Sequence, residues 1–158
     1  MAGLSTPKQK LSALVITYNE MGYIERCIGS ISFADEIIVV DSFSTDGTYE
    51  YLMAHPKVKV IQNPFENFTA QKSFTLKQAT NDWVLFLDAD EVVTEALQKE
   101  ITATINNPEA DEAYWFYRKF LYIRTICTRK SKIGSKAIEL GWAQRSAPTS
   151  QSKFLPPQ

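Results

Sequence analysis

The sequence predicts an α/β fold in which a mostly parallel central sheet carries helices on both faces. Three observations support this prediction. Continuous apolar runs have the length of buried strands, segments with helical apolar spacing follow them, and the connections between the two are short. Strands that alternate with helices in this way form parallel sheets, and ligands bind beyond the carboxyl ends of such strands.

The expected strands are recognised by apolar or aromatic runs, most of which end abruptly in polar residues. The third run is followed by an Asn-Pro break, and the last is rich in aromatic and β-branched residues. In chain order these strands lie within Leu11–Glu20, Glu36–Asp41, Val58–Ile61, Trp83–Glu91 and Ala113–Ile126.

The expected helices lie between these runs. Within Glu20–Ser32, apolar residues recur with the spacing of one helical face, and Ser44, Thr45 or Asp46 can cap a short helix that follows the second strand. Asn67–Thr80 is expected to be helical although its periodicity is weak. The last helix carries an apolar stripe and ends at an Asn-Asn-Pro sequence; the stripe is Val93, Leu97, Ile101 and Ile105.

The composition is that of a globular domain of 158 residues, with 44% hydrophobic and 22% charged residues. The net charge of −1 gives no reason to expect a nucleic-acid partner. A basic stretch, 119–132, has two interpretations: a solvated face, which we favour, or a peripheral contact with an anionic membrane surface.

Features at the N-terminus and at the cysteines favour a cytoplasmic location. Cys27 and Cys127 are far apart and lack metal-ligand spacing, which is typical of reduced thiols. The first ten residues contain no apolar signal segment, and no apolar run approaches the ~20 residues that span a bilayer. We therefore expect a cytoplasmic protein, with the inner face of the cytoplasmic membrane as a possible site of association.

Polar residues follow three of the expected parallel strands, within Thr17–Glu20, Asp41–Ser44 and Asp88–Glu91. A parallel sheet brings these strand ends to one edge. Any one carboxylate there could be a helix cap or a turn former. Three acidic exits at one edge predict a polar crevice.

The sequence Asp88-Ala89-Asp90-Glu91 predicts a divalent metal site. Closely spaced carboxylates repel each other unless a positive charge lies between them. Their hard oxygen atoms suit Mg²⁺ or Mn²⁺, and one or two protein ligands leave coordination positions for phosphate oxygens and water. The alternative is a solvated acidic turn that opens the next helix, whose positive N-terminal end would favour Glu91.

Two other nucleotide-binding folds and one phosphatase fold agree poorly with the sequence. A dinucleotide-binding fold would use Asp41 for a ribose hydroxyl, but neither its glycine-rich motif nor a P-loop occurs in the chain. A haloacid-dehalogenase-like phosphatase normally carries its Asp-x-Asp motif on the first strand. Here Asp88 falls on the fourth strand, and Asp41 would have no explanation.

Three separated motifs, ALVITYNE, IIVVDSFSTDGT and WVLFLDADE, resemble the nucleotide-binding half of the family 2 glycosyltransferases. The resemblance covers roughly residues 11–122, and within the family it is strongest to bacterial enzymes that add glucose or a related sugar to lipopolysaccharide core or other surface glycans. It implies a Rossmann-like nucleotide-diphospho-sugar transferase (GT-A) fold. It also implies metal-dependent, usually inverting transfer of a hexose from a UDP-sugar to a glycan or lipid-linked glycan.

The resemblance also implies roles for individual residues. Thr17, Tyr18 and Glu20 would lie beside the uridine, and Asp41 would accept a hydrogen bond from the uracil. Asp88 would contact the ribose or a metal-bound water, and Asp90 would coordinate the metal. Lys72 would lie near the nucleotide, although an exposed helix lysine is the alternative. Loop-shaping or capping is favoured for Ser42 and Asp46, and the aromatic run 114–117, Trp83 and His55 are expected to be structural or exposed.

The general base is not identified by the sequence. Glu91 is a weak candidate and is better suited to supporting the metal loop, while Glu139 does not match the family motif. We expect a tail at 1–10, a nucleotide-sugar-binding domain at 11–126 and an irregular tail at 127–158. The change in composition after 127 predicts a truncated or altered acceptor half. The alternative function is therefore a non-catalytic UDP-sugar-binding remnant.

Overall fold

The computed structural model describes residues 8–117 and 124–129. Its strands are β1 (Leu11–Thr17), β2 (Glu36–Asp41), β3 (Val58–Gln62), β4 (Trp83–Asp88), β5 (Ala113–Tyr117) and β6 (Arg124–Arg129). Its helices are α1 (Ile24–Ser30), α2 (Thr48–Ala54), α3 (Phe68–Gln78) and α4 (Glu95–Ile105). Strands and helices alternate as far as α4, as the apolar pattern predicts.

The strands form one six-stranded sheet in the order β3-β2-β1-β4-β6-β5. β1 pairs in parallel with both β2 and β4, and β2 pairs in parallel with β3. β6 runs antiparallel to β4 and to β5. The chain leaves β1 toward β2 on one side and reaches β4 on the other, so a topological switch point, where open α/β sheets bind their ligands, lies beyond the ends of these strands.

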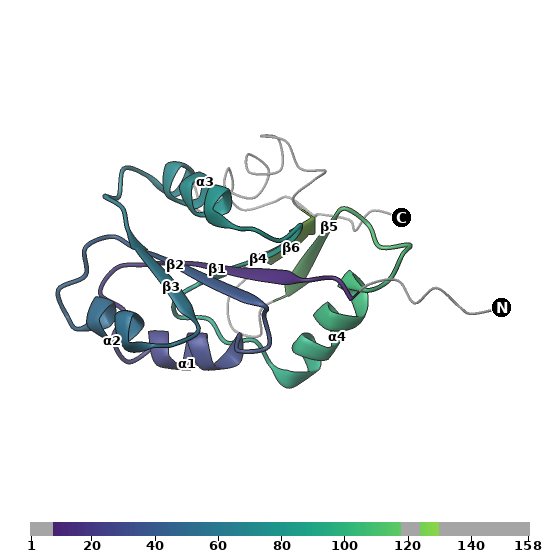
Figure 1. Cartoon of the computed structure of the whole chain (residues 1–158), viewed down its shortest axis with the longest axis horizontal. Coiled ribbons are helices and arrows are strands. Elements are labelled where there is room, and N and C mark those ends of the chain that lie inside the picture. The colour runs from purple at the N-terminus through teal and green to yellow at the C-terminus, as the bar shows by residue number, and fades with distance from the viewer. Residues whose placement is uncertain (1–7, 118–123, 130–158) are drawn as a thin grey trace, which may run out of the picture.

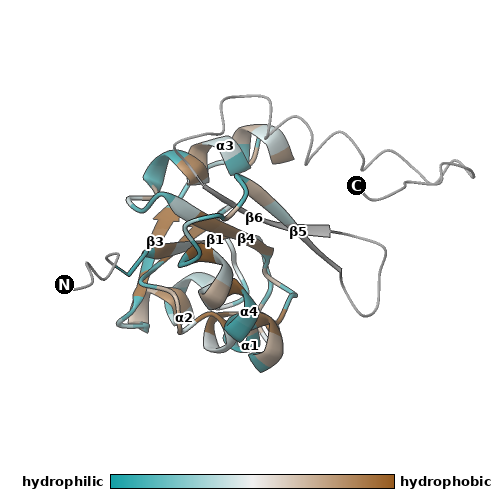
Figure 2. Cartoon of the chain, turned by 90° about the vertical axis from the view of Figure 1, so that its right-hand side faces the viewer, coloured by the Kyte–Doolittle hydropathy of each residue, from teal (hydrophilic) through white to brown (hydrophobic). Residues whose placement is uncertain are grey.

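Helices cover both faces of the sheet, which confirms the expected layers. α1, α2 and α4 lie on one face and α3 lies on the other (Figure 1). Side chains of β1 alternate between the layers: Leu11, Ala13 and Val15 belong to the larger apolar cluster, which includes residues of α1, α2 and α4. Leu14 belongs to the smaller cluster on the side of α3. Both cores are built around the buried apolar strands (Figure 2).

The polar residues on the buried side of α3 explain why the apolar periodicity of this segment is weak. Its buried side chains are Gln71, Lys72 and Thr75, so much of its inward face is polar. Asn67 starts the helix, because its side-chain oxygen accepts a hydrogen bond from the backbone N–H of Ala70 at 2.8 Å. A polar inward face next to the strand ends is a first indication of where function lies.

α1 is shorter than the sequence predicts. The apolar face within Glu20–Ser32 indicates a helix over the whole segment, but the helix begins at Ile24. Gly22 has a φ of 97°, and the carbonyl oxygen of Glu20 accepts from the amides of Tyr23 and Ile24, which makes a turn before the helix.

The single strand expected over Ala113–Ile126 is wrong, because the segment forms the antiparallel pair β5 and β6. The aromatic and β-branched residues of this segment do not reveal that it divides into two strands, and residues 118–123 lie outside the described part of the chain. β6 also continues to Arg129, so its last three residues, 127–129, fall within the expected irregular tail. The division of the chain into domain and tails stays a prediction.

Candidate functional site

The three polar strand ends meet at one edge of the sheet. Thr17, the last residue of β1, is paired in register with Asp41 of β2, and Ile16 is paired with Asp88 of β4. Asp41 is also in register with Gln62 at the end of β3. The sheet therefore assembles the predicted crevice residues at its switch point.

Asp41 is fully buried, and its carboxylate is held by two neighbours. Its Oδ2 atom accepts from the backbone N–H of Ser44 at 3.1 Å and from Nε2 of Gln62 at 3.2 Å. Its Oδ1 atom accepts from the Ser44 hydroxyl. The carboxylate thus shapes the loop that follows β2 in addition to the uracil contact that the sequence analysis expects of it.

The loops after β1 and β2 are joined by hydrogen bonds between them. Each loop contains one residue other than glycine with a left-handed backbone, Asn19 with φ 53° and Phe43 with φ 60°. Such conformations persist where surrounding contacts hold them. These contacts are Asn19 N to Ser44 Oγ at 2.9 Å, Thr45 N to Asn19 Oδ1 at 2.8 Å, Glu20 N to Thr48 Oγ1 at 3.0 Å and Met21 N to Asp46 Oδ2 at 2.9 Å.

Asp46 has the loop-shaping role that the sequence favours, and it also serves the start of α2. Its Oδ1 atom accepts from the backbone N–H of Thr48 at 3.0 Å and from the Thr48 hydroxyl at 2.6 Å. Gly47, with φ 97°, occupies the N-cap position, so no side chain caps the helix from there. The hydrogen bonds from the Thr48 hydroxyl and from the Met21 and Thr48 amides lower the pKa of Asp46, and together they outweigh the effect of desolvation.

A buried amide network connects α3 to the same loops. Gln71, which is 1% exposed, donates from Nε2 to the Ser42 hydroxyl at 3.0 Å and to the carbonyl oxygen of Asn63 at 3.1 Å. Its Oε1 atom accepts from Nδ2 of Asn63 at 2.7 Å. Ser42 is therefore part of the loop structure, as expected.

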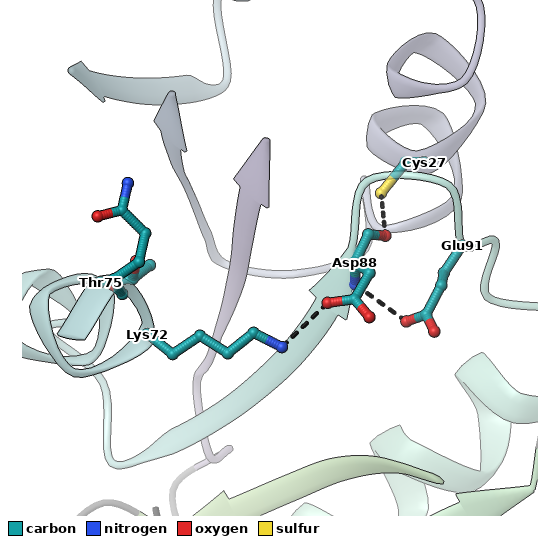
Figure 3. Close-up of polar contacts among 6 residues, drawn as sticks. Cys27, Lys72, Thr75, Asp88 and Glu91 are labelled. Atoms are coloured by element: carbon teal, nitrogen blue, oxygen red, sulfur yellow. Dashed lines mark hydrogen bonds and ion pairs between the residues drawn. The ribbon is translucent and has the colours of Figure 1, made fainter. Parts of the chain in front are cut away.

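Asp88 lies at the centre of the polar contacts drawn in Figure 3. Nζ of Lys72 lies 3.0 Å from its Oδ1 atom, and the two side chains are 5% and 19% exposed. The backbone N–H of Asp88 donates to Oε2 of Glu91 at 3.0 Å, and its carbonyl oxygen lies 3.7 Å from Sγ of Cys27. Lys72 is therefore a buried, ion-paired residue, and the alternative of an exposed helix lysine is wrong.

Asp90 and Glu20 belong to the same group of carboxylates. The Asp90 side chain is exposed beyond the end of β4. Burial raises the pKa of Glu20, and the negative charges of Asp90, Asp46 and Asp88 raise it further. Mutual repulsion of this kind is what a bound cation would relieve.

Thr17 and Tyr18 differ in exposure although they are adjacent. Thr17 is 5% exposed, and its hydroxyl has no hydrogen-bond partner among the residues that the structure describes. Tyr18 is 58% exposed, as is fitting for a ring available to stack on a planar ligand. The buried hydroxyl is a costly feature unless water or a ligand satisfies it.

Within the described part of the chain, no group of three or more His, Cys, Asp or Glu side chains has the arrangement of a metal site. A site with one or two protein carboxylates, as the sequence analysis expects, lies below that number. Asp88 is already paired with Lys72, so Asp90 is the better placed of the two for a cation. The carboxylates thus fit a divalent ion that shares its coordination with phosphate and water.

The structure also places the residues for which no catalytic role is expected. Trp83 packs in the core, and Tyr114 packs partly buried against it. His55 is half-buried rather than fully exposed, and its ring lies near that of Tyr51. The basic stretch 119–132 lies largely outside the described residues, and Glu139 lies outside them altogether.

Sequence reasoning missed the residues that organise the site from other elements. These are Asn19, Gln62, Asn63, Gln71 and Thr48, together with Ser44, which the sequence suggests only as a helix cap. For most of them the available signal was a position close to the end of a strand or the start of a helix, and Gln71, inside α3, lacked even this signal. No helix of the described residues is long and apolar enough to cross a membrane.

Comparison with known proteins gives the family of this chain. The family model of Glycosyl transferase family 2 matches residues 12–149. A curated relative, the lipopolysaccharide core biosynthesis glycosyltransferase LpsC of Rhizobium meliloti, is 38% identical over 97 residues, which are 59% of this chain and 36% of the relative. This chain also spans less than half the length of the glycosyltransferases of Rickettsia strains that it matches at 38–45% identity.

Two solved structures share the architecture. The S. aureus TarS 1-349 fragment in complex with UDP is 31% identical with a TM-score of 0.53, covering 62% of this chain and 32% of that one. The mannosyltransferase PcManGT of Pyrobaculum calidifontis, solved with GDP-Man and Mn²⁺, is 20% identical with a TM-score of 0.63, covering 80% of this chain and 46% of that one. The expected GT-A fold is confirmed. With its mostly parallel sheet and its match to the family model, this chain belongs to glycosyl transferase family 2.

Proposed function

We propose that this chain forms the donor-binding part of a glycosyltransferase that moves a hexose, glucose or a related sugar, from a UDP-sugar to a glycan or lipopolysaccharide-type acceptor. The observation that carries the proposal is the meeting of Thr17, Asp41 and Asp88 at the switch point of the sheet. The UDP complex of TarS supports the donor class, and the name of LpsC supports the acceptor class. A cytoplasmic location at the inner membrane face goes with this acceptor and stays a prediction.

The first part of the site would hold the uridine. The buried Thr17 hydroxyl needs a hydrogen-bond partner, and the exposed Tyr18 ring offers a stacking surface. Asp41 would accept from the N–H of the uracil ring, which requires Gln62 to share or release its Oδ2 atom. Gln62 is an exposed side chain and can move at little cost.

The second part would hold the diphosphate through a divalent cation, Mg²⁺ or Mn²⁺. Asp90 would hold this cation, with Asp88 oriented toward the ribose or a metal-bound water. When bound, the cation would act as a Lewis acid that offsets the charge of the departing UDP. The surrounding loops are already fixed by hydrogen bonds, so their dipoles need little reorganisation as that charge develops.

Glu91 is better suited to holding the turn than to acting as the general base. Its Oε2 atom accepts from the backbone N–H of Asp88, which fixes the start of the Asp-x-Asp turn. An inverting reaction requires a carboxylate within hydrogen-bond reach of the acceptor hydroxyl. We assign that base to none of the described residues.

A thermal-shift experiment tests the proposal directly. With UDP at about one hundred times its dissociation constant, binding stabilises the folded chain by about 2.7 kcal/mol. For a chain of this size that corresponds to a rise in Tm of about 5–10 °C, and we expect the rise to require Mn²⁺ or Mg²⁺. The Asp90→Ala variant should lose the metal-dependent part, whereas Asp82→Ala, an exposed aspartate before β4, should retain it.

A failure of UDP to raise Tm with either metal would overturn the proposal, as would an unchanged shift in Asp90→Ala. A turnover assay with UDP-glucose and Mn²⁺ then separates the two forms of the function. Release of UDP, by transfer or by slow hydrolysis, supports an enzyme. A shift without any release supports a binding module that lacks catalysis.

A further inference from the structure

Lys72 reaches Asp88, in the central sheet, from the helix layer on the side of α3. It projects from α3, on one face of the sheet, and its Nζ atom lies 3.0 Å from Oδ1 of Asp88 at the end of β4 (Figure 3). Its neighbours on the buried side of α3, Gln71 and Thr75, are themselves hydrogen-bonded. Gln71 ties this part of α3 to the loops that follow β2 and β3.

The burial of this ion pair argues for a specific role. An ammonium group whose side chain is 5% exposed loses most of its hydration, and only good pairing compensates for that loss. A position on α3 that needed only to fill space could carry an apolar residue, since such replacements are often neutral or stabilising. The lysine thus suggests a requirement beyond stability.

The charge balance of the site supplies that requirement. Asp90, Asp46 and Asp88 lie close enough to Glu20 for their negative charges, after burial, to raise its pKa. A nucleoside diphosphate adds further negative charge to this edge of the sheet. Lys72 contacts Asp88 and cancels one of these charges.

We propose that Lys72 is a positioning residue of the donor site, whose ammonium group fixes the orientation of the Asp88 carboxylate and neutralises it toward the diphosphate. The effect of Lys72 on UDP binding passes through Asp88 and requires no direct contact between Lys72 and the nucleotide. This inference rests on the proposed function, because it assigns Lys72 a part in UDP binding.

A double-mutant cycle separates this role from direct contact with the nucleotide. Lys72→Met keeps the stem and removes the charge, Asp88→Asn removes the charge of the partner, and the third variant combines both changes. Lys77→Met is the matched control, since Lys77 is exposed on the same helix. The Kd of UDP is measured with Mn²⁺ by isothermal titration calorimetry on the full chain, well below the lowest Tm of the set.

We expect Lys72→Met and Asp88→Asn each to raise the Kd of UDP about tenfold. The Kd of the double variant should be no more than about twice that of the single variant that binds UDP more weakly. Lys77→Met should stay within about twofold of the parent chain. At a temperature where every variant is folded, a purely structural lysine would leave the Kd unchanged, and that outcome overturns the inference. Effects that multiply to about one hundredfold also overturn it, because they show that Lys72 acts independently of Asp88. If the parent chain itself fails to bind UDP, the proposed function fails with it.

Discussion

Asp41→Asn tests whether the buried carboxylate organises the site before any nucleotide binds. The substitution is almost isosteric, so it leaves the packing intact while removing the charge. Ser44 donates to Asp41 from its backbone N–H and from its hydroxyl, and Gln62 donates from its side-chain amide. All three donors then face a neutral group, one end of which is itself a donor.

The expected loss of stability is about 1–2 kcal/mol. A hydrogen bond to a charged group contributes ~1.5–3 kcal/mol, against ~0.5–1.5 kcal/mol for a neutral pair, so the two Ser44 bonds lose about 1 kcal/mol each. Gln62 is exposed and can rotate its amide to accept from the new Asn, which adds little. Removal of the buried charge recovers some desolvation cost, and this lowers the total toward the smaller figure.

Urea denaturation at pH 7, followed by circular dichroism, gives this difference as a change in midpoint at constant slope. Gln62→Ala is the matched control, because it removes one donor and leaves the carboxylate; we expect less than about 1 kcal/mol there. An Asp41→Asn variant as stable as the parent chain would contradict this expectation. In that case the hydrogen bonds of the carboxylate contribute no net stability, and the loop is held by other contacts.

The remaining predictions concern ionisable groups. Burial and the negative charges of Asp90, Asp46 and Asp88 place the folded pKa of Glu20 above its unfolded value, so the native chain loses stability as pH rises through that window. Glu20→Gln should remove this loss and raise Tm at pH 7 by at most the equivalent of about 1 kcal/mol. An unchanged pH profile of Tm would contradict the burial and the repulsion of this carboxylate. Burial alone would raise the pKa of Glu36, but the hydrogen bonds to its carboxylate lower that pKa overall. The stability that Glu36 contributes should therefore be lost as pH falls through its folded pKa. Glu36→Gln should flatten the acid limb of a Tm-against-pH curve while leaving UDP binding unchanged. Burial raises the pKa of the Cys27 thiol to about 12. In a Cys127→Ser background, a thiol reagent at pH 8 should therefore modify Cys27 only after urea is added. Rapid labelling of the native chain would refute the burial of this thiol.

The strands and the edge at which they meet could be predicted because their signals are local. A continuous apolar run such as that of β1, which ends in Thr17, needs no knowledge of its neighbours to be read as a buried strand. Parallel pairing then places Thr17 beside Asp41 by topology alone. The same logic brings Asp88 to the adjacent position on the other side of β1.

The environment of each site residue could not be predicted, because it depends on the register between strands and on contacts between a helix and the sheet that it covers. Gln62 meets Asp41 only because β2 and β3 pair in one register, and a shift of one residue would turn its side chain to the other face. Lys72 meets Asp88 across 16 residues of sequence and two layers of structure. Its helix showed weak periodicity for the same reason, since polar residues occupy the buried side near the site.

The strained loops suggest why so much hydrogen bonding is concentrated at this edge. A left-handed conformation at Phe43, a residue with a full side chain, costs on the order of 1–2 kcal/mol, and Asn19 bears a smaller cost of the same kind. The bonds between the two loops offset these costs, each at about 1 kcal/mol net. Stability alone would be served as well by relaxed loops with fewer bonds. The combination of strain with bonds that oppose it instead fixes one backbone geometry around Asp41 and Asp88, and a site that is rigid before its ligand arrives loses less entropy on binding.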